Sequence, residues 1–147
     1  MQKYYFTGNY SHSLDDRGRL AIPARLRDKL GDVVWVTNGR KCLVLYPDST
    51  WTTLADQVLA LPMWDPRAGE MRRFVFGDAA ECEIDKQGRI LIPSNLRETA
   101  GVNESVAIVG AGDYIEIWDR DTWNAEHKKL IDNPPMASYS DDRMRGR

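Results

Sequence analysis

The stretch LDDRGRLAIPARLRDKLG at residues 14–31 recurs as IDKQGRILIPSNLRETAG at residues 84–101, without a gap and at a constant offset of 70 residues. The two copies share an aspartate, a Gly-Arg pair, an Ile-Pro step, a Leu-Arg pair and a final glycine. Self-similarity of this kind indicates that one supersecondary unit is present twice. We therefore expect two similar halves rather than a solenoid of many repeats.

Each copy has the residues of a tight turn followed by a strand and a short helix. Asp15 or Asp85 can accept hydrogen bonds from nearby backbone N–H groups, and the glycine three residues later tolerates a positive φ. Alternating apolar residues then predict a short strand. The proline of the Ile-Pro step suits the first turn of a helix, because its missing N–H would have no partner there. Gly31 and Gly101 are placed to end the two helices.

The similarity continues beyond the two motifs. Residues 33–46 parallel residues 105–118, and Trp51 has its counterpart in Trp123. Each half is therefore predicted to run strand, turn, strand, short helix, hairpin and helix. In the first hairpin, Asn38-Gly39 between apolar runs predicts a two-residue turn.

Two helical segments are predicted between the copies, within residues 48–76 and broken near residues 63–66. The final polar, proline-interrupted segment has almost no core-forming residues, so we expect a mobile tail. The predicted division is a first unit, a helical connection, a second unit, and the end of a C-terminal helix with its tail, at residues 1–53, 54–75, 76–125 and 126–147.

Composition favours a small globular protein and excludes a polycation. The chain has 147 residues, of which 42% are hydrophobic and 29% charged, with a formal net charge of −2. Binding to an anionic partner must therefore come from a local basic patch. No apolar run reaches membrane-spanning length and no export signal is recognisable, so we expect a cytoplasmic protein with no membrane partner. Its two cysteines, Cys42 and Cys82, are expected to be reduced and buried.

The arginine after each turn, Arg19 or Arg89, allows two interpretations. It can brace its own aspartate, although an exposed ion pair contributes only about 0–1 kcal/mol. Alternatively, the aspartate shapes the turn and orients the arginine toward an anionic ligand, since the guanidinium fork suits phosphate oxygens and the guanine edge. Both motifs are locally basic in an acidic chain, and two similar contact points suit a repetitive ligand such as duplex DNA.

The paired Asp-x-x-x-Arg turns, each followed by Ile-Pro and Leu-Arg, closely resemble the MraZ family. The resemblance covers about residues 1 to 130, including GDAAECEID and WDRDTW. It implies an α+β, β-rich fold of two tandem, pseudo-symmetric AbrB-like β units of the swapped-hairpin type, with short helices packed outside. It also implies a homo-oligomeric ring, nucleoid association, and a bacterial transcriptional regulator that binds short direct repeats of double-stranded DNA in the promoter of its own cell-division and cell-wall operon.

In that family the DxxxR loops contact DNA, and this carries over to the matching positions here. We expect Arg19 and Arg89 to make direct contacts and Arg17 and Lys86 to attract phosphates, while the aspartates set the loops. Which loop reads bases stays open, because the loop interiors differ. The predicted DNA-binding residues are Asp15, Arg17, Arg19, Asp85, Lys86 and Arg89.

Other polar residues are given simpler roles. For Arg25, Arg27 and Arg97 a solvated helix face, or a pair with Asp28 or Glu98, is favoured. His12 and His127 lack partners at metal-ligand spacing, so we predict no metal, no cofactor and no small-molecule ligand. The motifs of common enzyme classes are missing, which argues against catalysis. The alternatives to specific regulation are a nonspecific nucleoid-associated protein and a protein-interaction scaffold.

Overall fold

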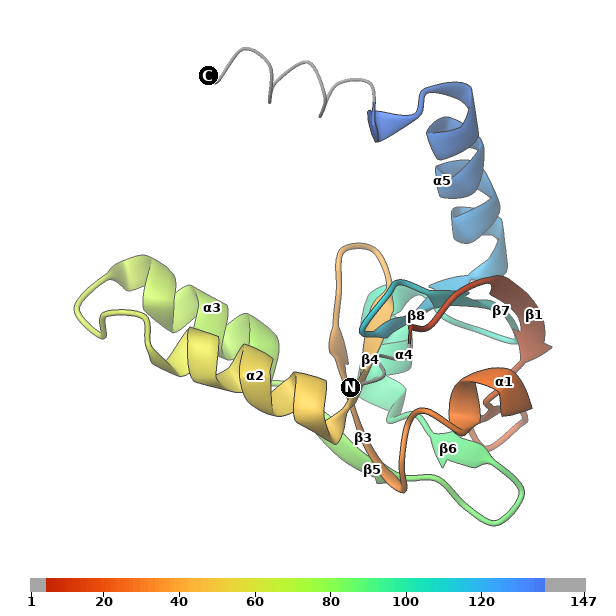
Figure 1. Cartoon of the computed structure of the whole chain (residues 1–147), viewed down its shortest axis with the longest axis horizontal. Coiled ribbons are helices and arrows are strands. Elements are labelled where there is room, and N and C mark those ends of the chain that lie inside the picture. The colour runs from red at the N-terminus through yellow and green to blue at the C-terminus, as the bar shows by residue number, and fades with distance from the viewer. Residues whose placement is uncertain (1–4, 137–147) are drawn as a thin grey trace.

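The computed structural model describes residues 5–136, and each half follows the predicted order of elements (Figure 1). The first half contains β1 (Asn9–Ser13), β2 (Arg19–Ala21), α1 (Ala24–Arg27), β3 (Val33–Asn38), β4 (Leu43–Pro47) and α2 (Asp48–Leu59). After α3 (Pro66–Phe76), the second half contains β5 (Ala80–Glu83), β6 (Arg89–Leu91), α4 (Ser94–Ala100), β7 (Ser105–Gly110), β8 (Ile115–Asp119) and α5 (Arg120–Asp132).

The two halves exchange strands. The six-stranded antiparallel sheet has the order β1-β7-β8-β4-β3-β5, so β1 pairs with the hairpin of the second half and β5 with the hairpin of the first. The hairpins meet in the middle of the sheet, where β4 pairs with β8. Equivalent strands of the two halves lie at equivalent distances from the two edges of the sheet, so the order is symmetric about the β8–β4 pair. The expected α+β fold of two tandem, pseudo-symmetric units with swapped strands is confirmed.

A second, two-stranded ribbon joins the two repeated motifs. In it β2 pairs antiparallel with β6, and Leu20 lies opposite Ile90. Both of these side chains are fully buried, because one face of the ribbon covers the core. The copies of the repeat are therefore direct neighbours in space.

The main core is shared between the halves. Apolar side chains from both motifs and both hairpins form one cluster, including Leu20, Ile22, Leu26, Ile90, Ile92 and Leu96. A half taken alone would leave much of this surface in water. Strand exchange thus solves the problem that two half-length units are each too small for a sufficient core.

The longer helices lie outside the sheet. Helices α2 and α3 form an arm that extends away from the body, and α5 extends in a different direction (Figure 1). At the base of the arm Trp35 stacks on Trp51, with ring centroids 4.9 Å apart. Trp118 and Trp123 pack together at the start of α5. Tryptophans therefore pack where α2 and α5 begin. Within residues 5–136, no helix is both long and apolar enough to cross a membrane.

Three local predictions need correction. The first hairpin is closed by a longer turn, since Asn38 pairs with Leu43 and the positive φ falls on Lys41 rather than on Gly39. Pro23 and Pro93 precede their helices as N-cap residues instead of lying in the first turn. Helix α1 ends at Arg27, before Gly31, whereas Gly101 ends α4 in the left-handed conformation as expected. The predicted mobile tail lies mostly outside the described residues, from residue 137 onward.

Candidate nucleic-acid interface

The first repeated turn is organised by Asp15. Its Oδ1 accepts hydrogen bonds from the backbone N–H groups of Arg17 and Arg19, both at 2.9 Å. Its Oδ2 accepts from Nε of Arg19 at 2.7 Å. Gly18 has φ +82°, a conformation that a side chain would strain. One carboxylate therefore shapes the loop and also fixes the base of the arginine side chain.

The second turn repeats this arrangement. Asp85 Oδ1 accepts from the N–H groups of Gln87 and Arg89 at 2.9 Å each, and Oδ2 accepts from Arg89 Nε at 3.0 Å. Gly88 has φ +77°. The two interpretations of the Asp–Arg pair, as a brace and as an oriented ligand-binding group, are thus compatible. The aspartate binds Nε of its arginine and does not occupy the Nη atoms at the outer edge of the guanidinium.

The ribbon places both arginines on one face. Arg19 lies opposite Leu91 and Arg89 lies opposite Ala21, and all four residues alternate with the buried Leu20 and Ile90. Side chains of a strand alternate between faces, so Arg19 and Arg89 both point outward, diagonally across the ribbon. The Cα atoms of Arg19 and Arg89 are separated by two residues along the ribbon and by one strand across it, which gives a distance of about 8 Å. This corresponds to two or three base-pair steps of about 3.4 Å.

The loop carboxylates are held in the charged form. Backbone hydrogen bonding by the Arg19 N–H, with the Arg19 side chain adding to it, lowers the pKa of Asp15 to about 2. The equivalent hydrogen bond from the Arg89 N–H lowers the pKa of Asp85. Both aspartates are therefore ionised at neutral pH, and each is already occupied by three donors within its own loop.

The two loops differ in their interiors, as the sequence indicates. In the second loop Gln87 Oε1 accepts from Arg89 Nη2 at 2.6 Å, so this guanidinium is held at two points. Position 17 carries an arginine, which cannot accept such a bond, and within residues 5–136 the guanidinium of Arg19 is bound only by Asp15. Arg17 and Lys86 are exposed at the loop tips, where their charges face solvent.

Two arginines were misjudged from the sequence. Arg27 and Arg97 are half-buried, and within residues 5–136 neither forms an ion pair with Asp28 or Glu98. Arg27 instead donates from Nη1 to the carbonyl of Gln87 at 3.3 Å, in the loop of the other half. The available signal was that both arginines occur at the same position of the repeat, whereas Arg25, which is exposed, does not recur.

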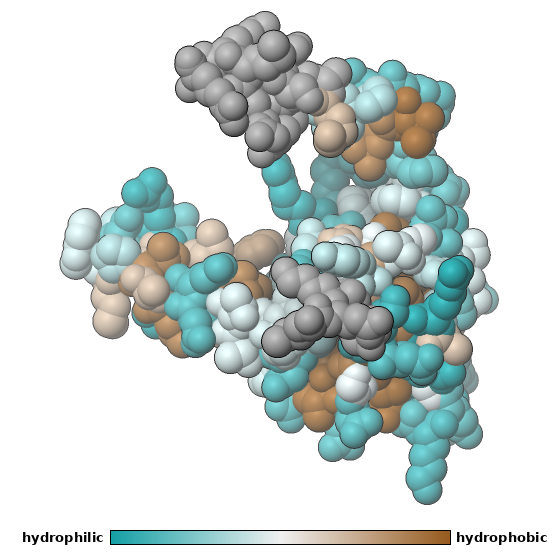
Figure 2. Space-filling model, viewed as in Figure 1, coloured by the Kyte–Doolittle hydropathy of each residue, from teal (hydrophilic) through white to brown (hydrophobic). Residues whose placement is uncertain are grey.

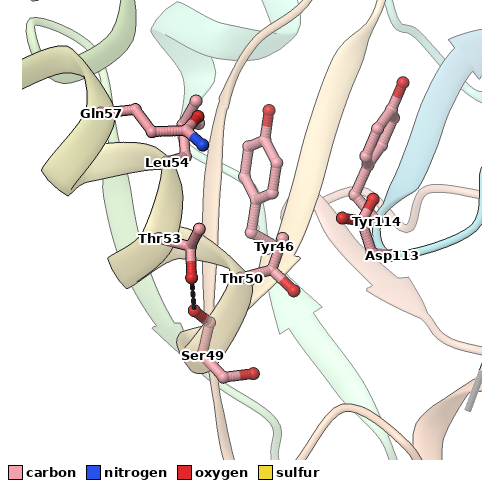
Figure 3. A pocket seen from close by; sticks show the side chains of 8 residues that line it. All are labelled: Tyr46, Ser49, Thr50, Thr53, Leu54, Gln57, Asp113 and Tyr114. Atoms are coloured by element: carbon pink, nitrogen blue, oxygen red, sulfur yellow. Dashed lines mark hydrogen bonds between the residues drawn. The ribbon is translucent and has the colours of Figure 1, made fainter. Parts of the chain in front are cut away.

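A separate hollow of about 380 Å³ lies between α2, β4 and the β7–β8 turn (Figure 3). The rings of Tyr46 and Tyr114 stand side by side there, with centroids 5.7 Å apart, and burial raises the pKa of both phenols, that of Tyr46 to about 12. Its lining contains Asp113 but no basic residue, which does not suit an anionic ligand. Elsewhere in residues 5–136, no three His, Cys, Asp or Glu side chains are grouped to hold a metal ion.

Comparison with known proteins identifies the family of the chain. The sequence profile described as "MraZ protein, putative antitoxin-like" matches twice, at residues 5–74 and 75–145. The chain belongs to the MraZ family. The two MraZ matches meet near the end of α3, between residues 74 and 75, so each contains one DxxxR loop.

Several curated MraZ relatives are similar over most of their length, and each is named "Transcriptional regulator MraZ". The relative from Heliobacterium modesticaldum is 46% identical over 84% of this chain and 87% of its own. The relative from Thermomicrobium roseum is 43% identical over 90% of this chain and 94% of its own. The relative from Desulfitobacterium hafniense is 44% identical over 92% and 95%, respectively.

Proposed function

We propose that this MraZ family member is a non-enzymatic transcriptional regulator that binds double-stranded DNA through the loops at residues 15–19 and 85–89. The single observation that carries the proposal is the pair of Asp-oriented arginines on one outward face of the β2–β6 ribbon. The printed name of its relatives, transcriptional regulator, supports the same role.

The geometry suits DNA because each arginine keeps donors free. Nε is occupied by the loop aspartate, while within residues 5–136 Nη1 of Arg89 and both Nη atoms of Arg19 have no hydrogen-bond partner. These are the atoms that contact phosphate oxygens or the O6 and N7 of guanine. The exposed side chains of Arg17 and Lys86 add positive charge beside them, and a contact to phosphate positions the protein without reading sequence.

In its finer form the proposal includes the target. The resemblance to the family points to short direct repeats in the promoter of the chain's own cell-division and cell-wall operon, and to association with the nucleoid. A pair of arginines about two to three base-pair steps apart can cover only a short element. Several copies of the protein on several repeats would then provide the length that a promoter site needs.

The test is binding of the purified protein to the DNA upstream of its gene, measured by fluorescence anisotropy against shuffled DNA of equal composition. Arg19→Ala and Arg89→Ala should each weaken binding to the native fragment by about 5-fold or more, as expected for loss of a base contact of about 1–3 kcal/mol. Arg25→Ala is the matched control, because this arginine of α1 is exposed and, within residues 5–136, its side chain forms no hydrogen bond or ion pair with either loop.

The other outcomes separate the alternatives. Unchanged affinity in both loop variants would remove the loops from the interface. Equal affinity for native and shuffled DNA would favour the nonspecific nucleoid-associated protein. No binding to either DNA would favour the scaffold that binds an acidic protein.

We also propose that the chain forms a homo-oligomer, a ring by resemblance to the family. The arm of α2 and α3 exposes large apolar side chains among polar ones (Figure 2), namely Leu59, Leu61, Met63, Trp64, Met71 and Phe74. Trp64 is 85% exposed. Contact with another copy would cover such surface. Trp64→Glu should reduce the mass measured by light scattering, and an unchanged mass would exclude the arm tip from the contact.

We also propose the division of the chain into a first unit, a helical connection, a second unit, and the end of a C-terminal helix with its tail, at residues 1–53, 54–75, 76–125 and 126–147.

A further inference from the structure

Two arginines of the repeat reach across from one half to the loop of the other. Arg97, on α4, lies so close to the first loop that a Cβ added to Gly18 would be 2.8 Å from its Cζ. Arg27, on α1, lies against the second loop in the same way, and a Cβ on Gly88 would overlap its guanidinium. Both arginines are half-buried, which is not the usual state of a free surface charge.

The backbone makes the same crossing. The N–H of Ile22 donates to the carbonyl of Gly88 at 2.9 Å, and the N–H of Ile92 donates to the carbonyl of Gly18 at 3.0 Å. Each loop is thus held by hydrogen bonds to its own aspartate and by a backbone hydrogen bond from the opposite half. The arginine side chains extend this crossed support to the loop glycines, whose positive φ sets the direction of the chain entering the ribbon.

We propose that Arg27 and Arg97 are positioning residues of the DNA interface and act in a crossed manner. Arg97 holds the loop at residues 15–19, and Arg27 holds the loop at residues 85–89. Through them the two loops of one chain form one rigid binding surface. The inference rests on the proposed DNA-binding function. It adds which residues hold Arg19 and Arg89 in place.

The competing explanation is that Arg27 and Arg97 only attract phosphates by their charge. A lysine substitution separates the two explanations, because lysine keeps the charge but lacks the planar fork that packs on the glycine and donates to the Gln87 carbonyl. Charge attraction predicts nearly full binding by Arg27→Lys and Arg97→Lys. Positioning predicts a loss.

The binding test uses the full chain and the native upstream fragment. Arg27→Lys and Arg97→Lys should each weaken binding by about 3-fold or more, within the range of direct coupling between contacting residues, while the salt dependence stays that of the unmodified protein. Arg25→Lys, on the exposed side of α1, is the matched control and should bind normally.

Double variants test the crossing. In an Arg89→Ala background, Arg27→Lys should have little further effect, because the arginine that it positions is gone. In an Arg19→Ala background, Arg27→Lys should keep its full effect. Arg97→Lys should show the reverse pattern. Equal effects in both backgrounds would overturn the crossed assignment.

A measurement without DNA separates this inference from the proposed function. In Arg27→Met, hydrogen exchange should accelerate at the amides of Gln87, Gly88 and Arg89 but not at residues 17–19, and Arg97→Met should do the opposite. Normal exchange in α5 would show that the variants are folded. Unchanged exchange in both loops would refute positioning even if DNA binding is confirmed. A protein with the expected exchange that does not distinguish native from shuffled DNA would instead contradict the proposed function.

Discussion

Replacing Gly88 by alanine tests the contact between the two halves in a quantitative way. Gly88 and Gly31 share a φ of +77°, but they differ in surroundings. A Cβ at Gly31 meets nothing within 4 Å, whereas a Cβ at Gly88 would overlap the guanidinium of Arg27. Gly31→Ala therefore measures the backbone strain alone, and Gly88→Ala measures the same strain together with the displacement of Arg27.

The expected magnitudes follow from these two terms. A Cβ in the left-handed region costs about 1–2 kcal/mol, and the lower entropy of the unfolded chain offsets about 0.4–1 kcal/mol of this. Gly31→Ala should then lower the free energy of unfolding by about 1 kcal/mol. At Gly88, Arg27 must also give up its hydrogen bond to the Gln87 carbonyl, which contributes about 0.5–1.5 kcal/mol. Gly88→Ala should therefore cost about 2 kcal/mol in total.

Urea unfolding at one fixed protein concentration, followed by tryptophan fluorescence, measures both values. The decisive variant is Gly88→Ala in an Arg27→Ala background, where the overlap is absent and the substitution should cost no more than Gly31→Ala. If Gly88→Ala costs the same with and without Arg27, the reasoning about the crossed contact is wrong.

Three further predictions concern pH, thiol reactivity and the shared core. The pKa of Asp15 in the folded protein is about 2, below the ordinary value of about 3.9, so the stability that ionised Asp15 contributes is complete above about pH 4 and is lost as the pH falls through 2. When the free energy of unfolding is measured against pH, Asp15→Asn should lack this part of the acid dependence. Burial raises the pKa of the Cys42 and Cys82 thiols, so both should react with a thiol reagent only after urea unfolds the chain, and fast labelling of the folded protein would contradict their burial. Fragments 1–77 and 78–147 should each be unfolded or self-associated when alone, because β1 and β2 pair with strands of the other half. Sedimentation and near-UV circular dichroism test this, and a folded monomeric fragment would contradict the shared core.

Much of the local structure could be predicted because it depends on neighbours in sequence. The turn at Asp15 follows from an aspartate that reaches backbone N–H groups two and four residues ahead and from a glycine that accepts a positive φ. The same chemistry predicted the second turn. The first hairpin was also predicted, but its turn was wrong, because Asn-Gly pairs suit a two-residue turn and the actual turn passes through Lys41.

The candidate site was predicted in part. The six predicted residues lie in two loops at opposite ends of the antiparallel ribbon, and the ribbon places Arg19 and Arg89 on one face. Arg27 and Arg97 were assigned to solvated helix faces, because a charged residue near Asp28 or Glu98 in the sequence is most often a surface charge. Arg97 donates to the nearby carbonyl of Ile92, but both arginines also lie against a loop about 60 to 80 positions away, and no local pattern reports such a contact.

By itself, the sequence determined that one unit is present twice, which elements each unit contains, and which aspartate and glycine shape each loop. Only the tertiary structure decided which strands pair. Alternation of apolar residues indicates which face of a strand is buried but not which strand lies beside it. Pairing across the halves builds the shared core that neither half could form alone, and the same pairing places Arg19 and Arg89 on one face and lets Arg27 and Arg97 each reach the opposite loop.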